Sequence, residues 1–313
     1  MSVVIASSGD SPGLGQTLAR TRAQVDAAGG ELILVLNRRR SEIADIRLGE
    51  WSQLAQRLLF EDRPGKSRAL NLAVREARAG ICAFVDDDAL PEQGWLEALL
   101  GPLRSDPGCA GVGGRVLPVW PAAGVPRWYR RLCSGRGTFF LGPRHDLGDA
   151  PLDYSPQAIA SLPFGANCAW RRALLLEVGY AEDLGPNRET GTRGGEDALL
   201  ARTLLDRGHR VVYVPSAIVH HPVAPERMTA RYVLEGYYWQ GVERARIQHH
   251  LGSTLPPAAR RRAVCMLWRT APFALLEPLL SEGLRVRLLR RRARSRGVLD
   301  ELARLTSGAG PPA

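Results

Sequence analysis

Short apolar runs alternate with stretches of helical periodicity along the first part of the chain. Residues 3–6 and 32–36 are continuous apolar runs, as in buried strands, and between them Leu14, Leu18 and Val25 recur on one helical face. Two buried strands around one helix form a β-α-β unit, in which the strands are parallel. The pattern therefore predicts an α/β protein with a largely parallel sheet.

The same periodicities predict further elements as far as residue 221. Residues 117–160 are instead rich in Pro, Gly, Arg and aromatic residues, so we expect an irregular functional loop there. The expected helices cover residues 51–59, 66–79, 95–103, 172–178 and 194–206, and the expected strands cover residues 81–85, 110–116 and 210–215.

Three consecutive carboxylates, Asp86, Asp87 and Asp88, follow the apolar run of residues 81–85. Like charges at the end of a strand repel one another, and a divalent cation such as Mg²⁺ or Mn²⁺ would relieve that repulsion. Ligands of open α/β sheets also bind where strands end. A solvated acidic turn before the helix near Trp95 explains these residues equally well. The triplet alone therefore does not distinguish a metal site from such a turn.

Two further clusters carry candidate chemistry. Lys66, the single lysine beside 41 arginines, lies in a Gly-containing turn that opens a helix, which favours a phosphate, although solvated cations on a capped helix are the commoner explanation. Glu196 and Asp197 begin a helix and would suit either helix capping or general-base chemistry. The adjacent histidines His220 and His221 follow a strand and are either metal ligands or surface residues, of which surface residues are commoner.

Taken in order, these motifs resemble those of family 2 glycosyltransferases with the GT-A fold. The likeness covers residues 2–225 and rests on GKSRALN, FVDDDALPEQGWL, FGANCAWRR and GGEDALLARTLLDRGHRVVYVPSAIVHH. It implies a Rossmann-like, mainly parallel sheet with flanking helices, plus a C-terminal helical extension. We expect residues 1–225 to form this domain, with a nucleotide-sugar half (1–115) and an acceptor half (116–225), and residues 226–313 to form a basic extension.

The resemblance also implies roles for single residues. Asp86 and Asp88 would be the ends of an Asp-x-Asp motif that holds Mn²⁺ or Mg²⁺, with a histidine as a further ligand. Alternation along the strand places His221 on one face with Ala217 and Val219, which favours His221 over His220 as this ligand. Asp197 would be the general base, assisted by Glu196, in an inverting transfer of sugar from a nucleotide-diphosphate sugar to an acceptor hydroxyl. The residues expected to bind the nucleotide sugar are Ser7, Ser8, Asn37, Lys66, Arg68, Asp86, Asp87, Gly165, Ala166 and Asn167.

The chain departs from the family pattern in two places that concern the nucleotide base. Ser7-Ser8-Gly9-Asp10 stands where relatives often have a Pro-Thr-Tyr-Asn-like loop, and Asn37 stands where they often have an aspartate. The Asn37 amide can still bond a base edge. A UDP-sugar is the favoured donor, and GDP- and dTDP-sugars stay open.

Composition bounds the remaining possibilities. The net charge of +10 is concentrated from Leu255 onward, where 12 arginines face four acids. No stacking aromatics are interleaved with residues 284–296, which argues against nucleic acid. The five scattered cysteines, the missing basic leader and the lack of about 20 uninterrupted apolar residues predict a cytoplasmic protein without a membrane span.

The C-terminal tract allows two interpretations. The apolar stretch of residues 263–289, with Arg290, Arg291 and Arg292 behind it, suits helices that lie on an anionic bilayer, where a lipid-linked acceptor would be found. A solvated bundle or a dimer interface is equally consistent with it.

Two other functions compete with sugar transfer. A non-catalytic sugar-nucleotide-binding module would keep Asp86 and Asp88 but would not need the Glu196–Asp197 pair. A nucleotidyltransferase would use similar metal chemistry, but its glycine-rich activating loop is not visible near the N-terminus.

Overall fold

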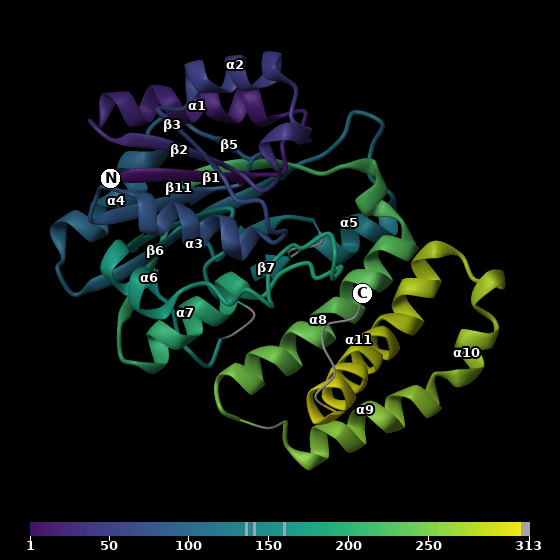
Figure 1. The fold of residues 1–313 in the computed structure, drawn as a ribbon. Coiled ribbons are helices and arrows are strands. Elements are labelled where there is room, and N and C mark those ends of the chain that lie inside the picture. Colours follow the sequence, from purple (N-terminus) through teal and green to yellow (C-terminus); the bar gives the residue numbers. More distant parts are fainter. Residues whose placement is uncertain (135–136, 140–141, 159–160, 254, 308–313) are drawn as a thin grey trace. The chain divides into compact units, whose positions relative to one another are not determined.

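A computed structural model shows a mixed β-sheet with helices on both faces and a set of C-terminal helices (Figure 1). It describes residues 1–134, 137–139, 142–158, 161–253 and 255–307. Contacts divide the chain into two units. The first unit comprises Met1–Val119, Gly135–Gly185 and Glu196–Pro222, and the second comprises Trp120–Ser134, Pro186–Gly195 and Val223–Ala313.

The sheet of the first unit has the strand order β3-β2-β1-β4-β10-β6-β11-β5. The pairs β1–β2, β1–β4, β2–β3 and β6–β11 are parallel, whereas β10 runs antiparallel between β4 and β6. The strands are β1 Ser2–Ser7, β2 Glu31–Leu36, β3 Arg57–Phe60, β4 Ile81–Val85, β5 Leu90–Pro91, β6 Cys109–Val119, β7 Gly137–Phe139, β8 Arg144–Asp146, β9 Leu152–Asp153, β10 Asn167–Arg171 and β11 Arg210–Pro222.

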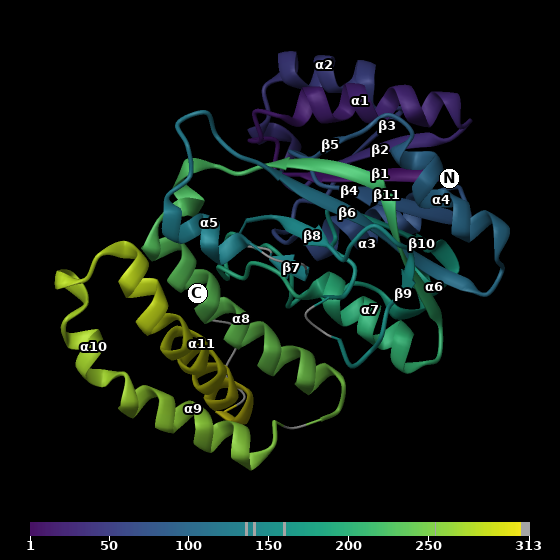
Figure 2. The same ribbon diagram turned by 180° about the vertical axis from the view of Figure 1, so that it is seen from behind.

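Helices cover both faces of this sheet (Figures 1 and 2). Helices α1, α2 and α4 pack on one face, and α3, α6 and α7 pack on the other. The expectation of an α/β sheet with flanking helices is thus met. The helices of the first unit are α1 Leu14–Ala27, η1 Arg40–Glu42, α2 Asp45–Leu54, α3 Lys66–Glu76, α4 Trp95–Ser105, α6 Arg172–Val178 and α7 Glu196–Asp206.

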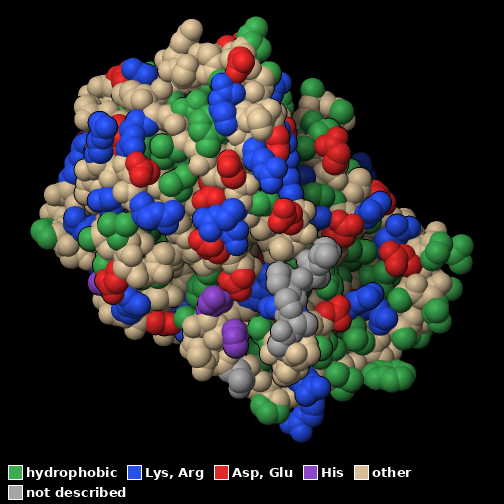
Figure 3. Space-filling view, viewed as in Figure 1, with side chains coloured by type: hydrophobic (Ala, Val, Ile, Leu, Met, Phe, Trp, Pro, Cys, Tyr) green, Lys and Arg blue, Asp and Glu red, His purple; other side chains and the backbone are tan. Residues whose placement is uncertain are grey.

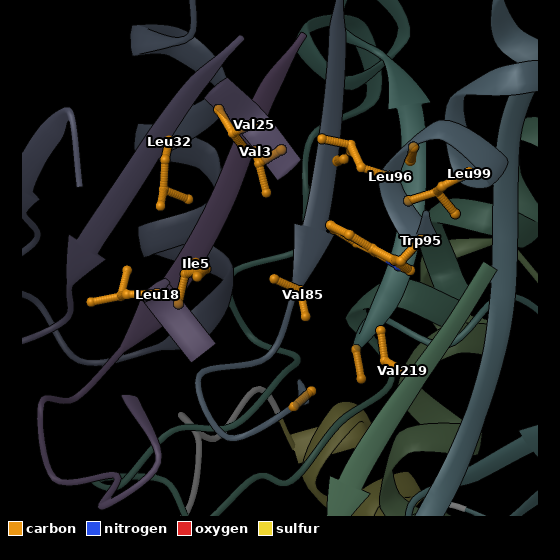
Figure 4. Packing of buried hydrophobic residues seen from close by; sticks show 14 of the residues in the cluster. Val3, Ile5, Leu18, Val25, Leu32, Val85, Trp95, Leu96, Leu99 and Val219 are labelled. Carbon is orange, nitrogen blue, oxygen red and sulfur yellow. The ribbon is translucent and has the colours of Figure 1, made fainter. Parts of the chain in front are cut away.

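The core on the α1/α4 face shows why the apolar runs become strands. Ile5 from β1 and Val85 from β4 meet Leu18 of α1 and Trp95 of α4 in one cluster (Figure 4). Neighbouring strand positions such as Phe84 point to the opposite face, where a second cluster forms. Strands buried on both faces require continuous apolar sequence, which is the pattern that predicted them.

Three predictions of elements were wrong in detail. The helix expected over residues 51–59 is instead the end of α2 followed by β3, because the backbone of Arg57–Phe60 pairs in parallel with β2. The strand expected to end at residue 215 continues to Pro222 through a register shift between Val214 and Ile218. The segment 117–160 contains α5 and the short strands β7, β8 and β9. β7 pairs locally with β8, whereas β8 also pairs with β6 and β9 pairs with the distant β11.

The second unit is helical, and a close crossing of two helices organises it. Helices α8 and α11 approach at Gly241 and Gly297, where an added Cβ would meet the main chain of the other helix. Arg246 and Glu301 form a buried ion pair of 2.8 Å nearby. No helix in the described part of the chain is long and apolar enough to cross a membrane. The elements are α5 Arg127–Cys133, η3 Pro225–Met228, α8 Ala230–His250, α9 Pro257–Arg269, α10 Ala271–Leu275, η4 Glu277–Leu279 and α11 Glu282–Ser307.

Candidate active site

Asp86, Asp88 and His221 form a candidate metal site at the end of β4. One potential ligand atom from each residue lies within 4.8 Å of the others. His221 Nε2 is 3.2 Å from Asp88 Oδ1 and 3.6 Å from Asp86 Oδ2. Pairing of β11 with β5 brings this histidine to the turn that carries the aspartates, 133 positions away in the sequence. Two carboxylates and an imidazole are a donor set that suits Mn²⁺ or Mg²⁺.

Alternation along β11 separates the two histidines. Ala217, Val219 and His221 are all buried, as predicted, whereas His220 points away and its Nε2 lies 2.5 Å from Glu92 Oε1. The geometry therefore places His221, and not His220, beside the aspartates.

The middle aspartate has different partners. Ser7 Oγ donates to Asp87 Oδ2, and Ser11 Oγ donates to its backbone carbonyl. Burial raises the pKa of Asp87 to about 6. These bonds tie the end of β1 to the end of β4. Ser8 lies beside them, and its Oγ donates to Asp10 Oδ2 at 3.3 Å.

Lys66 pairs directly with Asp86 across the end of the sheet. Burial by itself would lower the pKa of the Lys66 ammonium, but Asp86 and Glu196 outweigh it and raise that pKa. Burial would likewise raise the pKa of Asp86, but Lys66 and His221 hold it below its usual range. The lysine thus lies within the electrostatic reach of both the metal cluster and the Glu196–Asp197 pair.

Asn37 orders the loop that leads to Lys66. Its Nδ2 donates to the carbonyls of Glu61 (2.9 Å) and Arg63 (2.8 Å), and its Oδ1 accepts the Gly65 N–H (2.7 Å). Both of its amide hydrogens are used by the backbone. Arg68, in the first turn of α3, forms an ion pair with Glu182 at 3.1 Å.

Asp197 is held by backbone donors from two segments. Its Oδ2 accepts the Gly165 N–H at 2.7 Å, and its Oδ1 accepts the Ala198 N–H at 2.8 Å. A Cβ at residue 165 would lie 3.1 Å from Asp197 Oδ2, so glycine permits this close approach. Burial raises the pKa of Asp197.

Glu196 is the more isolated of the two acids. It is 4% exposed, and its Oε2 has no hydrogen-bond partner among the described residues. Burial and the charge of Asp197 raise its pKa. A Cβ at Gly185 would lie 3.1 Å from the Glu196 carboxyl carbon. This glycine was not predicted from the sequence, although Gly185-Pro186 is a dipeptide typical of turns.

Asn167 does not reach the surface of the site. It has no exposed area; its Oδ1 accepts the Trp95 indole N–H at 2.7 Å, and its Nδ2 donates to the carbonyls of Ala217 (2.8 Å) and Arg115 (2.9 Å). Ala217 lies in the register shift of β11, so this amide satisfies a carbonyl that the irregular pairing frees. Ala166 is buried beside it. Asn167 therefore braces the strand that carries His221.

Comparison with protein families identifies the chain. The sequence profile described as "Glycosyltransferase like family 2" matches residues 1–241, more than three quarters of the chain. The protein belongs to this glycosyltransferase family, as the resemblance predicted.

Curated relatives match about half of the chain. A glucosyl-dolichyl phosphate glucuronosyltransferase from Haloferax volcanii is 27% identical over 167 residues, 51% of this chain and 49% of the relative. A pre-mycofactocin glycosyltransferase from Mycobacterium tuberculosis is 28% identical over 157 residues, 50% of this chain and 30% of the relative. The match thus spans half or less of the length of these relatives.

Solved structures share the fold. The mannosyltransferase PcManGT from Pyrobaculum calidifontis, in complex with GDP-Man and Mn²⁺, has a TM-score of 0.58 at 18% identity and covers 96% of this chain and 86% of its own. Glucosyl-3-phosphoglycerate synthase from Mycobacterium tuberculosis, in complex with Mg²⁺ and UDP, has a TM-score of 0.53 at 18% identity. The match covers 81% of this chain and 80% of the synthase chain. The predicted GT-A fold is confirmed.

Proposed function

We propose that the protein transfers a sugar from a nucleotide-diphosphate sugar to an acceptor hydroxyl, with inversion at the anomeric carbon and dependence on Mn²⁺ or Mg²⁺. The observation that carries the proposal is the Asp86–Asp88–His221 cluster, linked electrostatically through Lys66 to the buried Glu196 and the half-buried Asp197. Membership of the glycosyltransferase family and neighbours that contain nucleotides with Mn²⁺ or Mg²⁺ support it.

Asp86, Asp88 and His221 would hold the divalent cation. When bound, it supplies Lewis-acid stabilisation of the negative charge on the departing diphosphate. The two carboxylates formally balance the charge of a divalent ion, so the diphosphate needs a further cation. The Lys66 ammonium, held at Asp86, adds positive charge on the same side.

Asp197 would accept the proton of the acceptor hydroxyl. Two backbone N–H groups fix its carboxylate in place, which is the preorganisation that a general base needs. Its raised pKa makes it a stronger base than an exposed aspartate. Attack on the face of the sugar opposite the leaving diphosphate gives inversion. Glu196, next to it, would orient the acceptor.

We further assign the donor-binding roles by position. Ser7, Ser8, Asp87 and Arg68 supply polar groups to the nucleotide. Gly165 lets the backbone approach the sugar beside Asp197. The other residues expected at the donor act through the scaffold, since their groups are buried or bonded to the backbone; they are Asn37, Ala166 and Asn167. UDP is the favoured nucleotide, with GDP and dTDP as the alternatives.

The acceptor would be a hydroxyl on a lipid-linked carrier. One relative is named as acting on a glucosyl-dolichyl phosphate, and the basic C-terminal helices would allow peripheral contact with a membrane. A nucleic acid is not expected as a partner.

Thermal unfolding with UDP, GDP and dTDP, each with and without Mn²⁺, tests donor binding. One nucleotide should stabilise the protein only when metal is present, by about 2.7 kcal/mol at 100 times its Kd. Asp88→Asn should abolish the metal-dependent part, and Asp62→Asn, a change of the same chemistry elsewhere on the surface, should not. No stabilisation by any nucleotide with Mn²⁺ would contradict the proposal.

A further inference from the structure

Exposed apolar side chains are concentrated in one short segment of the second unit. Eleven large apolar residues are exposed in the described part of the chain, and seven of these lie between residues 264 and 284. Isolated exposed apolar residues are ordinary, whereas a contiguous set marks an interaction surface. The seven residues are Val264, Trp268, Phe273, Leu275, Leu276, Leu279 and Leu284.

The most exposed of these residues face solvent almost completely. Trp268 is 77% exposed, Leu275 84% and Leu279 82%. They come from consecutive elements, α9, α10 and η4, and neither α10 nor η4 has a buried residue. In Figure 3, apolar side chains gather over the region where Figure 1 labels α10. We call the surface formed by the seven residues the apolar edge.

Positive charge accompanies the apolar edge. Residues 255–296 contain 11 arginines and two acids, a net charge of +9. In the described part of the chain, Arg260, Arg261, Arg262 and Arg269 of α9 are exposed and take part in no ion pair. This charge is therefore free to meet an external anionic surface.

We propose that the apolar edge inserts into the interfacial layer of an anionic lipid bilayer, with the arginines of α9 and α11 at the depth of the headgroup phosphates. Amphipathic helices that lie in the membrane plane combine apolar side chains with Lys and Arg in this way. Tryptophan favours the headgroup level, where Trp268 would lie. Each arginine near an anionic leaflet strengthens binding by about fivefold.

Other occupants fit the surface less well. Two copies of a segment with a charge of +9 repel each other, which disfavours a homodimer through this edge. Single-stranded nucleic acid is held by aromatic stacking beside its phosphate contacts, but five of the seven residues of the apolar edge are aliphatic. Residues 308–313, GAGPPA, contain no large apolar side chain that could cover the edge.

Cys265 provides a direct probe of insertion. It is the exposed cysteine of the chain, it lies between Val264 and Trp268, and the other four cysteines are buried. An environment-sensitive fluorophore on Cys265 should shift to shorter wavelength with vesicles that contain phosphatidylglycerol, and brominated acyl chains should quench it. The same fluorophore on Ile46→Cys, in a Cys265→Ser background, should not respond, although residue 46 is 75% exposed in the wild type.

Paired variants separate insertion from electrostatic attraction. Leu275→Ser with Leu279→Ser should weaken vesicle binding by at least about tenfold, and the control Ile46→Ser with Leu176→Ser should leave it unchanged. Both pairs remove two exposed apolar side chains, so neither change should disturb a core.

The charge variant is Arg261→Gln, Arg262→Gln and Arg269→Gln. It should weaken binding to anionic vesicles by about a hundredfold at low salt. A control variant with the same change in net charge in the first unit should lose much less vesicle affinity. Its substitutions are Arg20→Gln, Arg39→Gln and Arg78→Gln. The control arginines are exposed and outside the apolar edge.

Several results would overturn the proposal. One is an emission wavelength of the Cys265 fluorophore that does not change when anionic vesicles are added at low salt. Another is vesicle binding that the charge variant abolishes and the Leu275/Leu279 variant leaves intact, which would mean adsorption without insertion. A vesicle-free dimer in sedimentation that the Leu275/Leu279 variant dissociates would assign the apolar edge to a second copy of the chain.

Discussion

The two units treat charged side chains in opposite ways. At the candidate active site, Glu196 and His221 are buried and Asp86 and Lys66 are partly buried, and the pKa values of Asp86, Lys66 and Glu196 depend on charged neighbours. On α9, arginines stand exposed and without ion pairs in the described part of the chain. Desolvated charges need defined partners and so build a specific site. Exposed charges of one sign build a field, which suits an extended anionic surface.

The largest expected effect is a loss of sugar transfer in a variant whose fold is unchanged. Asp197→Asn keeps the size of the side chain but removes the basic oxygen. Loss of a general base typically lowers the rate by about 10²–10⁴, so sugar transfer should fall by that factor. Metal-dependent nucleotide binding, which we assign to Asp86, Asp88 and His221, should survive.

The matched variant Asp88→Asn should reverse this pattern and lose metal-dependent nucleotide binding first. The measurements are transfer rate and nucleotide Kd for both variants, with circular dichroism to check folding. A folded Asp197→Asn protein with near wild-type transfer would leave Asp197 as a helix cap only.

The second prediction concerns an ion pair that is buried in the second unit. Arg246 is 1% exposed and pairs with Glu301. Glu301→Gln would leave a buried guanidinium without its counter-charge, which should cost about 3–5 kcal/mol of unfolding free energy. The control Asp206→Asn breaks an ion pair of 2.6 Å with Arg202 on the surface of α7 and should cost less than about 1 kcal/mol.

Urea denaturation followed by circular dichroism measures both changes. Equal stability losses in the two variants would show that burial does not distinguish the two ion pairs. An unchanged stability of Glu301→Gln would show that the buried Arg246 does not depend on this counter-charge.

The third prediction concerns the decrease of folding stability at acidic pH. His145 of β8 is fully buried against Tyr154, and burial lowers its pKa to about 4 from an ordinary 6.5. Between these values the unfolded chain binds the proton and the folded chain does not, so stability decreases as the pH falls from about 6.5 to 4. The loss by pH 4 should approach about 3 kcal/mol.

His145→Gln should remove that part of the acid sensitivity while other groups still titrate. Unfolding free energies of both proteins at pH 7 and pH 4.5 give the comparison. If the two lose stability in parallel on acidification, His145 is not the group responsible.

Much of the fold could be read from local sequence. Buried parallel strands need apolar side chains on both faces, so the continuous apolar runs at residues 3–6, 32–36 and 81–85 are sufficient to predict strands. Strand β3 could not be recognised in this way, because its half-buried edge residues have no distinctive period and the pairing with β2 decides their conformation.

The candidate site was predictable in its residue types but not in its connections. The roles of Asp86, Asp88 and Asp197 follow from motif order and stay predictions. The pairing of Lys66 with Asp86 joins residues 20 positions apart on different elements, and no motif states it. Asn167 was expected at the donor, and only the three-dimensional structure shows its amide satisfying a carbonyl of β11 instead.

The sequence by itself determined the family, the alternation of strands and helices, and the sign of charge in each part of the chain, because these depend on residue type and short-range spacing. Tertiary structure decided which histidine meets the aspartates, what Asn37 and Asn167 bond to, and that the apolar residues near Trp268 remain exposed. Those outcomes depend on strand register and on packing between distant segments. A one-residue change of register would exchange His221 for His220.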